Sequence, residues 1–192
     1  WNTLAQTVAL FVVGPTVPWM VRTLGKRTGY MIYGVGGIIG AAVLAFSPLA
    51  TVPMLGLVAF FFLGIGINGI NTLMWAFEAD TVEYGEWKTH QRAEGTTYAV
   101  FSFTRKMGQA IGGFVGGLAL TWAGFSAAQA SQGLQQADGV AQSIQYWSGG
   151  LVGVFMLLSI AVMAFYPLTE DKFAQIVKEI TERRVQEVAS EI

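Results

Sequence analysis

Charged residues are missing from most of the chain, and their uneven placement is the feature that most limits how it can fold. Residues 1–77 carry three charged side chains and residues 107–169 carry one, whereas charges are dense at 78–106 and 170–192. A bilayer core about 30 Å thick is crossed by a helix of ~20 mostly apolar residues. Five stretches meet that requirement: 2–21, 28–47, 53–77, 96–123 and 146–167.

The composition indicates the same class of protein. Apolar residues make up 53% of the chain and charged residues only 12%, against roughly 25% charged residues in soluble domains. The chain has no Cys and one His, His90, which excludes Cys nucleophiles, disulfides and Cys/His zinc sites. A net charge of −1 offers no basic surface for nucleic acid. We predict an all-α integral membrane protein, embedded in the lipid bilayer, with no metal site.

Lys and Arg mark one side of the predicted membrane segments. They occur in the connection 22–27, in 78–106 and in the tail after Pro167, and they are absent from 48–53 and 124–145. Lys and Arg concentrate in cytoplasmic loops. The alternation therefore predicts a multi-pass protein of the cell (inner) membrane, with the N-terminus outside and the C-terminus in the cytoplasm.

The two ends of the chain differ in character. Residues 1–167 form the predicted transmembrane unit, and residues 168–192 form a cytoplasmic amphipathic tail. Apolar residues recur at helical spacing along the tail: Phe173, Ile176, Ile180, Val188 and Ile192. Because the chain begins at Trp1 with no signal-like segment, we expect a longer protein with at least one more span upstream.

Glycine recurs at four-residue spacing in three predicted spans. The repeats are Gly36 with Gly40, Gly108 with Gly112 and Gly116, and Gly149 with Gly153. Small residues at this spacing let helix backbones approach closely in lipid. We expect these glycines to pack the bundle internally, and a homodimer face is the alternative.

A polar stripe interrupts the third span. Asn68, Asn71, Thr72 and Trp75 lie at i, i+3, i+4 and i+7, which is one face of a helix. Amides and hydroxyls that face lipid are costly, so this face is expected to meet protein or a water-filled path. Two interpretations stay open. An aromatic ring beside amides suits a sugar, and Asn and Thr also bond neighbouring helices.

Two adjacent cations, Arg105 and Lys106, lie in the fourth predicted span. If the span begins near Thr96, they lie about 14 Å inside it. An unpaired cation at mid-bilayer costs at least ~2.5–3.5 kcal/mol, so it would need an anionic substrate or a carboxylate partner. If the span begins at Met107 instead, both cations lie at the membrane boundary.

Carboxylates are dense in the connection 78–94, which carries five acids and two bases, while the connection 22–27 carries three bases and no acid. Opposite charge on one membrane face predicts a latch in which the bases of 22–27 pair with Glu83 or Glu86. The expected cytoplasmic gate comprises Arg22, Lys26, Arg27, Asp80, Glu83, Glu86 and Arg92. The alternatives are a solvated loop, or an acid–base or metal site built from Glu78–Glu86 and His90 in a membrane-embedded enzyme acting on lipid or glycan.

One segment carries a family resemblance. Ala79–Thr89, together with Arg92, resembles the signature loop of the glycoside–pentoside–hexuronide cation symporters, and the similarity continues from Tyr98 through Thr104-Arg105-Lys106 to Ala110. The resemblance covers essentially the whole chain and is greatest to the glucuronide carriers of that family. It implies the major-facilitator fold of twelve helices in two halves, with this chain as helices 8 to 12 and the tail.

The resemblance also implies a function. It implies symport of a sugar with Na⁺ or H⁺ by alternating access, with the coupling-ion site in the N-terminal half and no other cofactor. Lys106 matches a family lysine that faces the central cavity. A sugar-stacking Trp is expected in such carriers where this chain has Asn71, and Trp75 lies one turn later.

We therefore expect a carrier rather than an enzyme, with an anionic sugar, most consistent with a glucuronide, as its substrate. In this expectation Arg105 and Lys106 bind the carboxylate of the sugar. The polar stripe of Asn68, Asn71, Thr72 and Trp75 binds its hydroxyls. The partners are the sugar, the bilayer and the N-terminal half of the same carrier.

Overall fold

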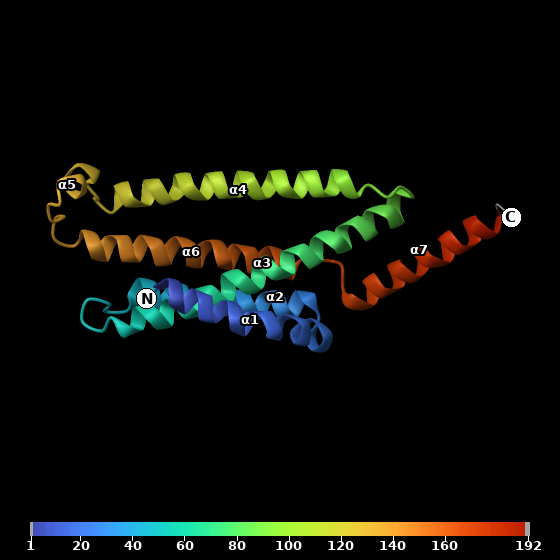
Figure 1. The fold of residues 1–192 in the computed structure, drawn as a ribbon, viewed down its shortest axis with the longest axis horizontal. Helices are drawn as coiled ribbons and strands as arrows, with labels where there is room; N and C mark the ends of the chain where they lie inside the picture. The colour runs from blue at the N-terminus through green and yellow to red at the C-terminus, as the bar shows by residue number, and fades with distance from the viewer. Residues whose placement is uncertain (1, 191–192) are drawn as a thin grey trace.

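The computed structural model describes residues 2–190, and regular structure in that range is entirely helical (Figure 1). The helices are α1 (Asn2–Leu24), α2 (Lys26–Phe46), α3 (Met54–Thr89), α4 (Glu94–Trp122), α5 (Ala127–Ser131), α6 (Val140–Ala164) and α7 (Glu170–Ser190). Four of them, α1, α2, α3 and α6, are long and apolar enough to cross a membrane. The remaining predicted span, the fourth at 96–123, corresponds to α4, which is glycine-rich and carries Arg105 and Lys106.

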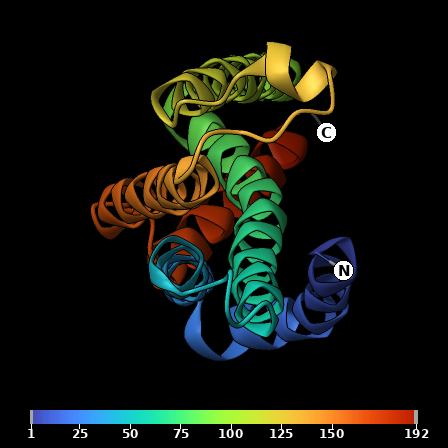
Figure 2. The same ribbon diagram turned by 90° about the vertical axis from the view of Figure 1, so that its left-hand side faces the viewer.

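The long helices run side by side (Figure 2). Helix α3 contacts both α1 and α2 on one side, and α4 lies on its other side. The turns α1–α2, α3–α4 and α6–α7 lie at the same end (Figure 1). We call this the charged end and define it as residues 22–27, 78–94 and 165–190. It gathers the three basic segments that the sequence places on one side of the membrane.

Backbones touch where α2 meets α3 and α6. A Cβ added at Gly66 of α3 would lie 2.5 Å from the Cα of Gly37 in α2, and one added at Gly149 of α6 would lie 2.6 Å from the carbonyl oxygen of Ala41. No real side chain fits at such distances, so the contact depends on glycine. A Cβ at Gly40 would meet the backbone of α3 in the same way. Internal packing is thus confirmed for Gly40 and Gly149.

Helix α4 is attached more loosely. Its glycines at 108, 112, 113, 116 and 117 face open space. Aromatic pairs hold it near its two ends: Phe101 lies 5.5 Å from Trp75 of α3 between ring centroids, and Trp122 lies 5.0 Å from Trp147 of α6. The internal packing expected of this glycine repeat is therefore not made within the described part of the chain.

Three predicted boundaries differ from the structure. The segment from Glu78, predicted as a connection, continues α3 without a break to Thr89. Charged side chains limit a membrane segment but do not end a helix, and this stretch contains no Pro. The connection 22–27 shrinks to Gly25, whose φ of 82° turns the chain between α1 and α2. Helix α6 occupies 140–164 instead of the predicted 146–167.

Helix α7 packs on the part of α3 that extends beyond α1 and α2. The shared apolar cluster consists of Leu168, Ile176 and Ile180, with Tyr84, Trp87, Tyr166 and Phe173 packed against it. Ile176 and Ile180, two of the predicted apolar positions, are 2% and 3% exposed. The side chain of Val188 and residue Ile192, predicted for the same face, lie outside the described residues.

Candidate functional site

The polar stripe bonds to its own helix. Asn71 Nδ2 donates to the carbonyl oxygen of Ile67, and Thr72 Oγ1 donates to that of Asn68, each at 2.8 Å. The interpretation that these two side chains bond neighbouring helices is therefore not realised among the described residues. Leu73, on the opposite face of α3, is 1% exposed in the core with α1 and α2. The stripe faces away from that core.

Trp75 and Arg105 meet between α3 and α4. The guanidinium carbon lies 5.2 Å from the centroid of the indole, which is within the range of a cation–π contact. Trp75 is 47% exposed, Arg105 is partly buried and Lys106 is exposed. The structure thus brings Arg105 to the polar stripe. Lys106, ~100° further around the helix, does not join this contact.

The position of Arg105 along the bundle follows from its partner. Helix α4 begins at Glu94 rather than Met107. Trp75 precedes Asp80 by five residues, or ~7.5 Å along α3, and Asp80 pairs with the first residue of α2. The Arg105 guanidinium therefore lies about one and a half turns of α3 from the Lys26–Asp80 pair.

A buried ion pair joins α2 to α3 at the charged end. Lys26 Nζ lies 2.6 and 2.7 Å from the two carboxylate oxygens of Asp80, whose residue is 5% exposed. The ammonium also lies 4.6 Å from the ring centroid of Phe173 in α7. The backbone N–H of Lys26 donates to the carboxylate of Glu170 at 2.8 Å. One basic residue therefore links α2, α3 and α7.

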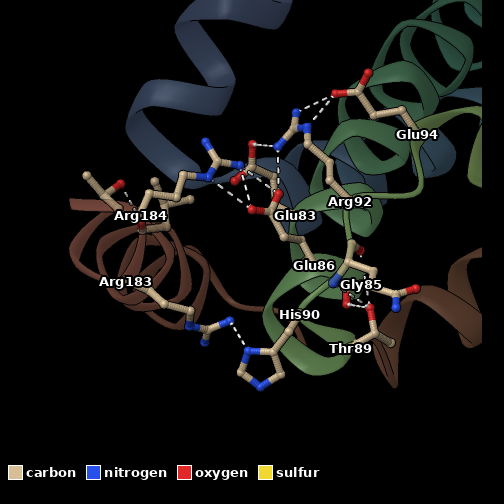
Figure 3. Close-up of polar contacts among 12 residues, drawn as sticks. Glu83, Gly85, Glu86, Thr89, His90, Arg92, Glu94, Arg183 and Arg184 are labelled. Atoms are coloured by element: carbon tan, nitrogen blue, oxygen red, sulfur yellow. Dashed lines mark hydrogen bonds and ion pairs between the residues drawn. The ribbon is translucent and has the colours of Figure 1, made fainter. Parts of the chain in front are cut away.

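Glu86 is the centre of a second charge cluster (Figure 3). Arg184 of α7 donates to both of its carboxylate oxygens at 2.6 and 2.7 Å, and Arg92 donates to it at 2.8 Å. Arg92 also lies 3.8 Å from Glu83 and 2.5 Å from Glu94. The hydrogen bond to Glu86, followed by that to Glu94, raises the pKa of Arg92.

The bases of 22–27 do not pair with Glu83 or Glu86 in this structure. Lys26 binds Asp80 and not Glu83 or Glu86, and Arg27 donates to the carbonyl oxygen of Ala164. Arg22 is exposed. The reason is that α3 stays helical beyond Asp80. Glu83 and Glu86 are then carried ~4.5 and ~9 Å further along the axis, past the start of α2 and toward Arg92 and α7.

The contribution of α7 to this cluster was not predicted from the sequence. Arg184 reaches Glu86, Arg183 lies 2.7 Å from Nδ1 of His90, and Glu179 accepts a hydrogen bond from the indole of Trp87 at 2.7 Å. That bond lowers the pKa of Glu179. The available signal was the charge imbalance: the acids of 78–94 outnumber its bases, and the tail carries paired arginines at 183–184.

The buried carboxylates of the charged end are held in ion pairs. Among the side chains that the structure describes, Asp80 and Glu86 are the buried carboxylates, and both are bound by basic side chains. Among residues 2–190 no group of three or more His, Asp or Glu side chains is placed to hold a metal ion.

A cavity lies where α4 stands off from α3 and α6. Its volume is about 530 Å³, and its wall is mostly apolar. Asn71 of the polar stripe lines it, together with Ser148 and Ser159 of α6. The cavity therefore borders the same face of α3 that carries Trp75.

Long apolar helices along one axis, with their charged connections gathered at one end, define a multi-pass membrane protein. Residues 1–170 match the family described as MFS/sugar transport protein. The chain belongs to this family of major-facilitator sugar transporters.

Individual relatives share much of the chain. The chain is 42% identical over 170 residues, 88% of its length, to the glucuronide carrier protein homolog of Escherichia coli (strain K12). It is 37% identical over 179 residues, 91% of its length, to a putative sulfoquinovose importer of the same strain. The isoprimeverose transporter of Lactiplantibacillus pentosus is 38% identical over 134 residues, 67% of the chain. These matches cover 36%, 36% and 27% of the relatives, so the chain spans about a third of their length.

Proposed function

We propose that these helices are part of a secondary carrier that moves an anionic sugar, with a glucuronide as the preferred substrate, across the membrane in symport with Na⁺ or H⁺. The helices α1, α2, α3, α4 and α6 are helices 8 to 12 of a twelve-helix carrier, and α7 is its cytoplasmic tail. Alternating access rocks this unit against the N-terminal half, which holds the coupling-ion site.

The contact of Arg105 with Trp75 beside the polar stripe is the observation that carries this proposal. A guanidinium offers a planar fork of donors that matches a carboxylate or a sulfonate. The amides of Asn68 and Asn71 lie one to two turns away on α3 and suit sugar hydroxyls. The names of two relatives support an acidic substrate, because a glucuronide carries a carboxylate and sulfoquinovose a sulfonate.

The charged end acts as the cytoplasmic gate. Its basic segments favour the cytoplasmic side, which puts the α4–α6 connection outside. Single cysteines at Ser131 and Thr89 test this orientation, since the chain has no Cys of its own. In intact cells an impermeant thiol reagent should label position 131 and spare position 89. The opposite labelling would reverse the orientation.

Gradient-driven uptake by the whole carrier tests the function. We expect vesicles to accumulate a glucuronide under a Na⁺ or H⁺ gradient and to lose it when the gradient collapses. Arg105→Lys should weaken uptake of the glucuronide more than uptake of its neutral glucoside analogue, because Lys cannot offer the bidentate fork. Met107→Leu, two residues along α4, is the matched control. Accumulation without any gradient dependence, or equal losses for the two sugars, would contradict the proposal.

A further inference from the structure

We infer that Trp75 is a positioning residue that holds the Arg105 guanidinium ready for the anionic group of the substrate, and is not a stacking platform for the sugar ring. This inference rests on the proposed function for the identity of the ligand. The contact itself rests on geometry alone.

The indole is held from α4. Phe101 and Arg105 are four residues apart on α4 and so share one face of that helix. Phe101 packs edge-on to Trp75 at 5.5 Å and 61°, and the Arg105 guanidinium lies over the indole at 5.2 Å. Two side chains of one helix therefore hold the same ring of α3. The guanidinium occupies a ring face that a sugar would need for stacking.

Among the described side chains of residues 2–190, no carboxylate oxygen lies within 4 Å of the Arg105 guanidinium. Arg92 and Arg184, in contrast, are bound to Glu86. An aromatic face attracts the cation without using its N–H donors. The five N–H donors of the guanidinium therefore stay available for a carboxylate or a sulfonate. Because the side chain is already held in place, less conformational entropy is lost when the substrate binds.

The two roles of Trp75 predict different selectivity. A stacking platform serves every sugar that carries an apolar ring face, so its loss weakens charged and neutral substrates alike. A positioning residue acts only through Arg105, so its loss weakens the anionic substrate alone. Replacement by Phe, which keeps an aromatic face, preserves the positioning role in large part.

The test uses the whole carrier with Trp75→Leu and Trp75→Phe, each made alone and together with Arg105→Gln. Apparent affinity is measured for a glucuronide and for the matching neutral glucoside. Cation–π contacts of ~0.5–2 kcal/mol correspond to a loss of about 2- to 30-fold for the glucuronide in Trp75→Leu. We expect a smaller loss in Trp75→Phe, no change for the glucoside, and no further loss when Trp75→Leu is added to Arg105→Gln. Phe103→Leu, at an exposed aromatic position of α4, is the control.

Equal losses for both sugars, or an undiminished effect of Trp75→Leu in the Arg105→Gln background, would overturn the positioning role. Thermal melting in detergent, without substrate, tests the contact separately on four proteins: the unchanged carrier, Trp75→Leu, Arg105→Gln and the double variant. A non-additive change in Tm for the double variant supports it, and strictly additive changes overturn it. A carrier with coupled Tm changes that fails to take up glucuronides would contradict the proposed function while leaving the contact in place.

Discussion

Helices α2 and α4 carry the same glycine spacing and have different surroundings. In α2 the backbone is pressed against α3 and α6, so that Gly37 and Gly40 have no room for a side chain. In α4 the repeat Gly108, Gly112 and Gly116 meets nothing within 4 Å among the described residues. Glycine spacing therefore marks helices that can approach a neighbour closely. Whether a helix does so in this fold is indicated by its charged residues.

Charge separates the two helices. Beyond its first turn α2 has no charged residue, whereas α4 carries Arg105 and Lys106 directly before its glycines. A cation within the span needs water, an anion or an aromatic partner. Helices α1, α2, α3 and α6 thus form a close-packed bundle, and in the proposed function α4 and the polar stripe of α3 together face the substrate.

The sharpest contrast between α2 and α4 should come from adding a methyl group to a glycine. Gly66→Ala places a Cβ 2.5 Å from the backbone of α2, and overpacking of this kind costs about 1–3 kcal/mol, or more where backbones cannot move. Gly112→Ala adds the same group in open space and should be neutral or stabilising by ~0.5–1 kcal/mol. Yield and Tm in detergent measure both. A larger loss of stability in Gly112→Ala than in Gly66→Ala would contradict the assignment of α2 and α3 to the close-packed bundle and of α4 to the substrate-facing surface.

A comparable loss is expected when the buried ion pair is broken. Asp80→Asn leaves Lys26 unpaired, with side chains only 16% and 8% exposed in the native pair. Removing one partner of a buried pair costs ~3–5 kcal/mol, and the exposure of Lys26 favours the lower end. Adding Lys26→Met should restore part of the stability. Glu182→Gln in the exposed pair with Lys178 is the control and should change little. Equal effects of Asp80→Asn and Glu182→Gln would show that Lys26–Asp80 is not a structural link.

The smallest effect should be a pH dependence of α7 docking. The indole of Trp87, and then the amide of Gln175, lower the pKa of Glu179 from the ordinary value of 4.5. A depressed carboxyl pKa stabilises docking above pH ~4.5 and loses this contribution as the pH falls through the lower folded value. The Trp87 emission, obtained by difference from Trp87→Phe, should therefore change below pH 4.5. Glu179→Gln should remove that change, and its persistence would exclude this carboxylate.

The number and rough position of the long helices could be predicted from the lengths of the segments without charged residues, since each of the five predicted spans overlaps a long helix. The continuation of α3 to Thr89 was missed because charge was equated with a connection. The glycine pattern could not tell α2 from α4, because spacing contains no information about the neighbouring helix. For the same reason Gly40 was predicted correctly and Gly112 was not.

The sequence indicated which residues belong to the candidate site but not which of them contact one another. Arg105 and Trp75 were both chosen from the sequence, and antiparallel helices bring together residues at similar distances from their turn. Trp75 lies 15 residues before His90, and Arg105 lies 12 residues after Ala93. This count becomes available only once α3 is known to end at Thr89. The contacts of Arg184 and Glu179 depend on how α7 folds back, which no local pattern determines.

The most direct test of the proposal that α4 faces the substrate, while α6 belongs to the close-packed bundle, is to measure how accessible each helix is to solvent. Single cysteines replace Gln109 of α4, which lies one turn beyond Arg105 on the same helix face, and Val154 of α6, and both positions are exposed. In the whole carrier a hydrophilic, impermeant thiol reagent should label position 109 rapidly, and a glucuronide should slow that labelling. Position 154 should stay unlabelled with or without the sugar because it lies on the opposite, lipid-facing side in this account. Rapid, sugar-sensitive labelling at 154 with none at 109 would contradict the account.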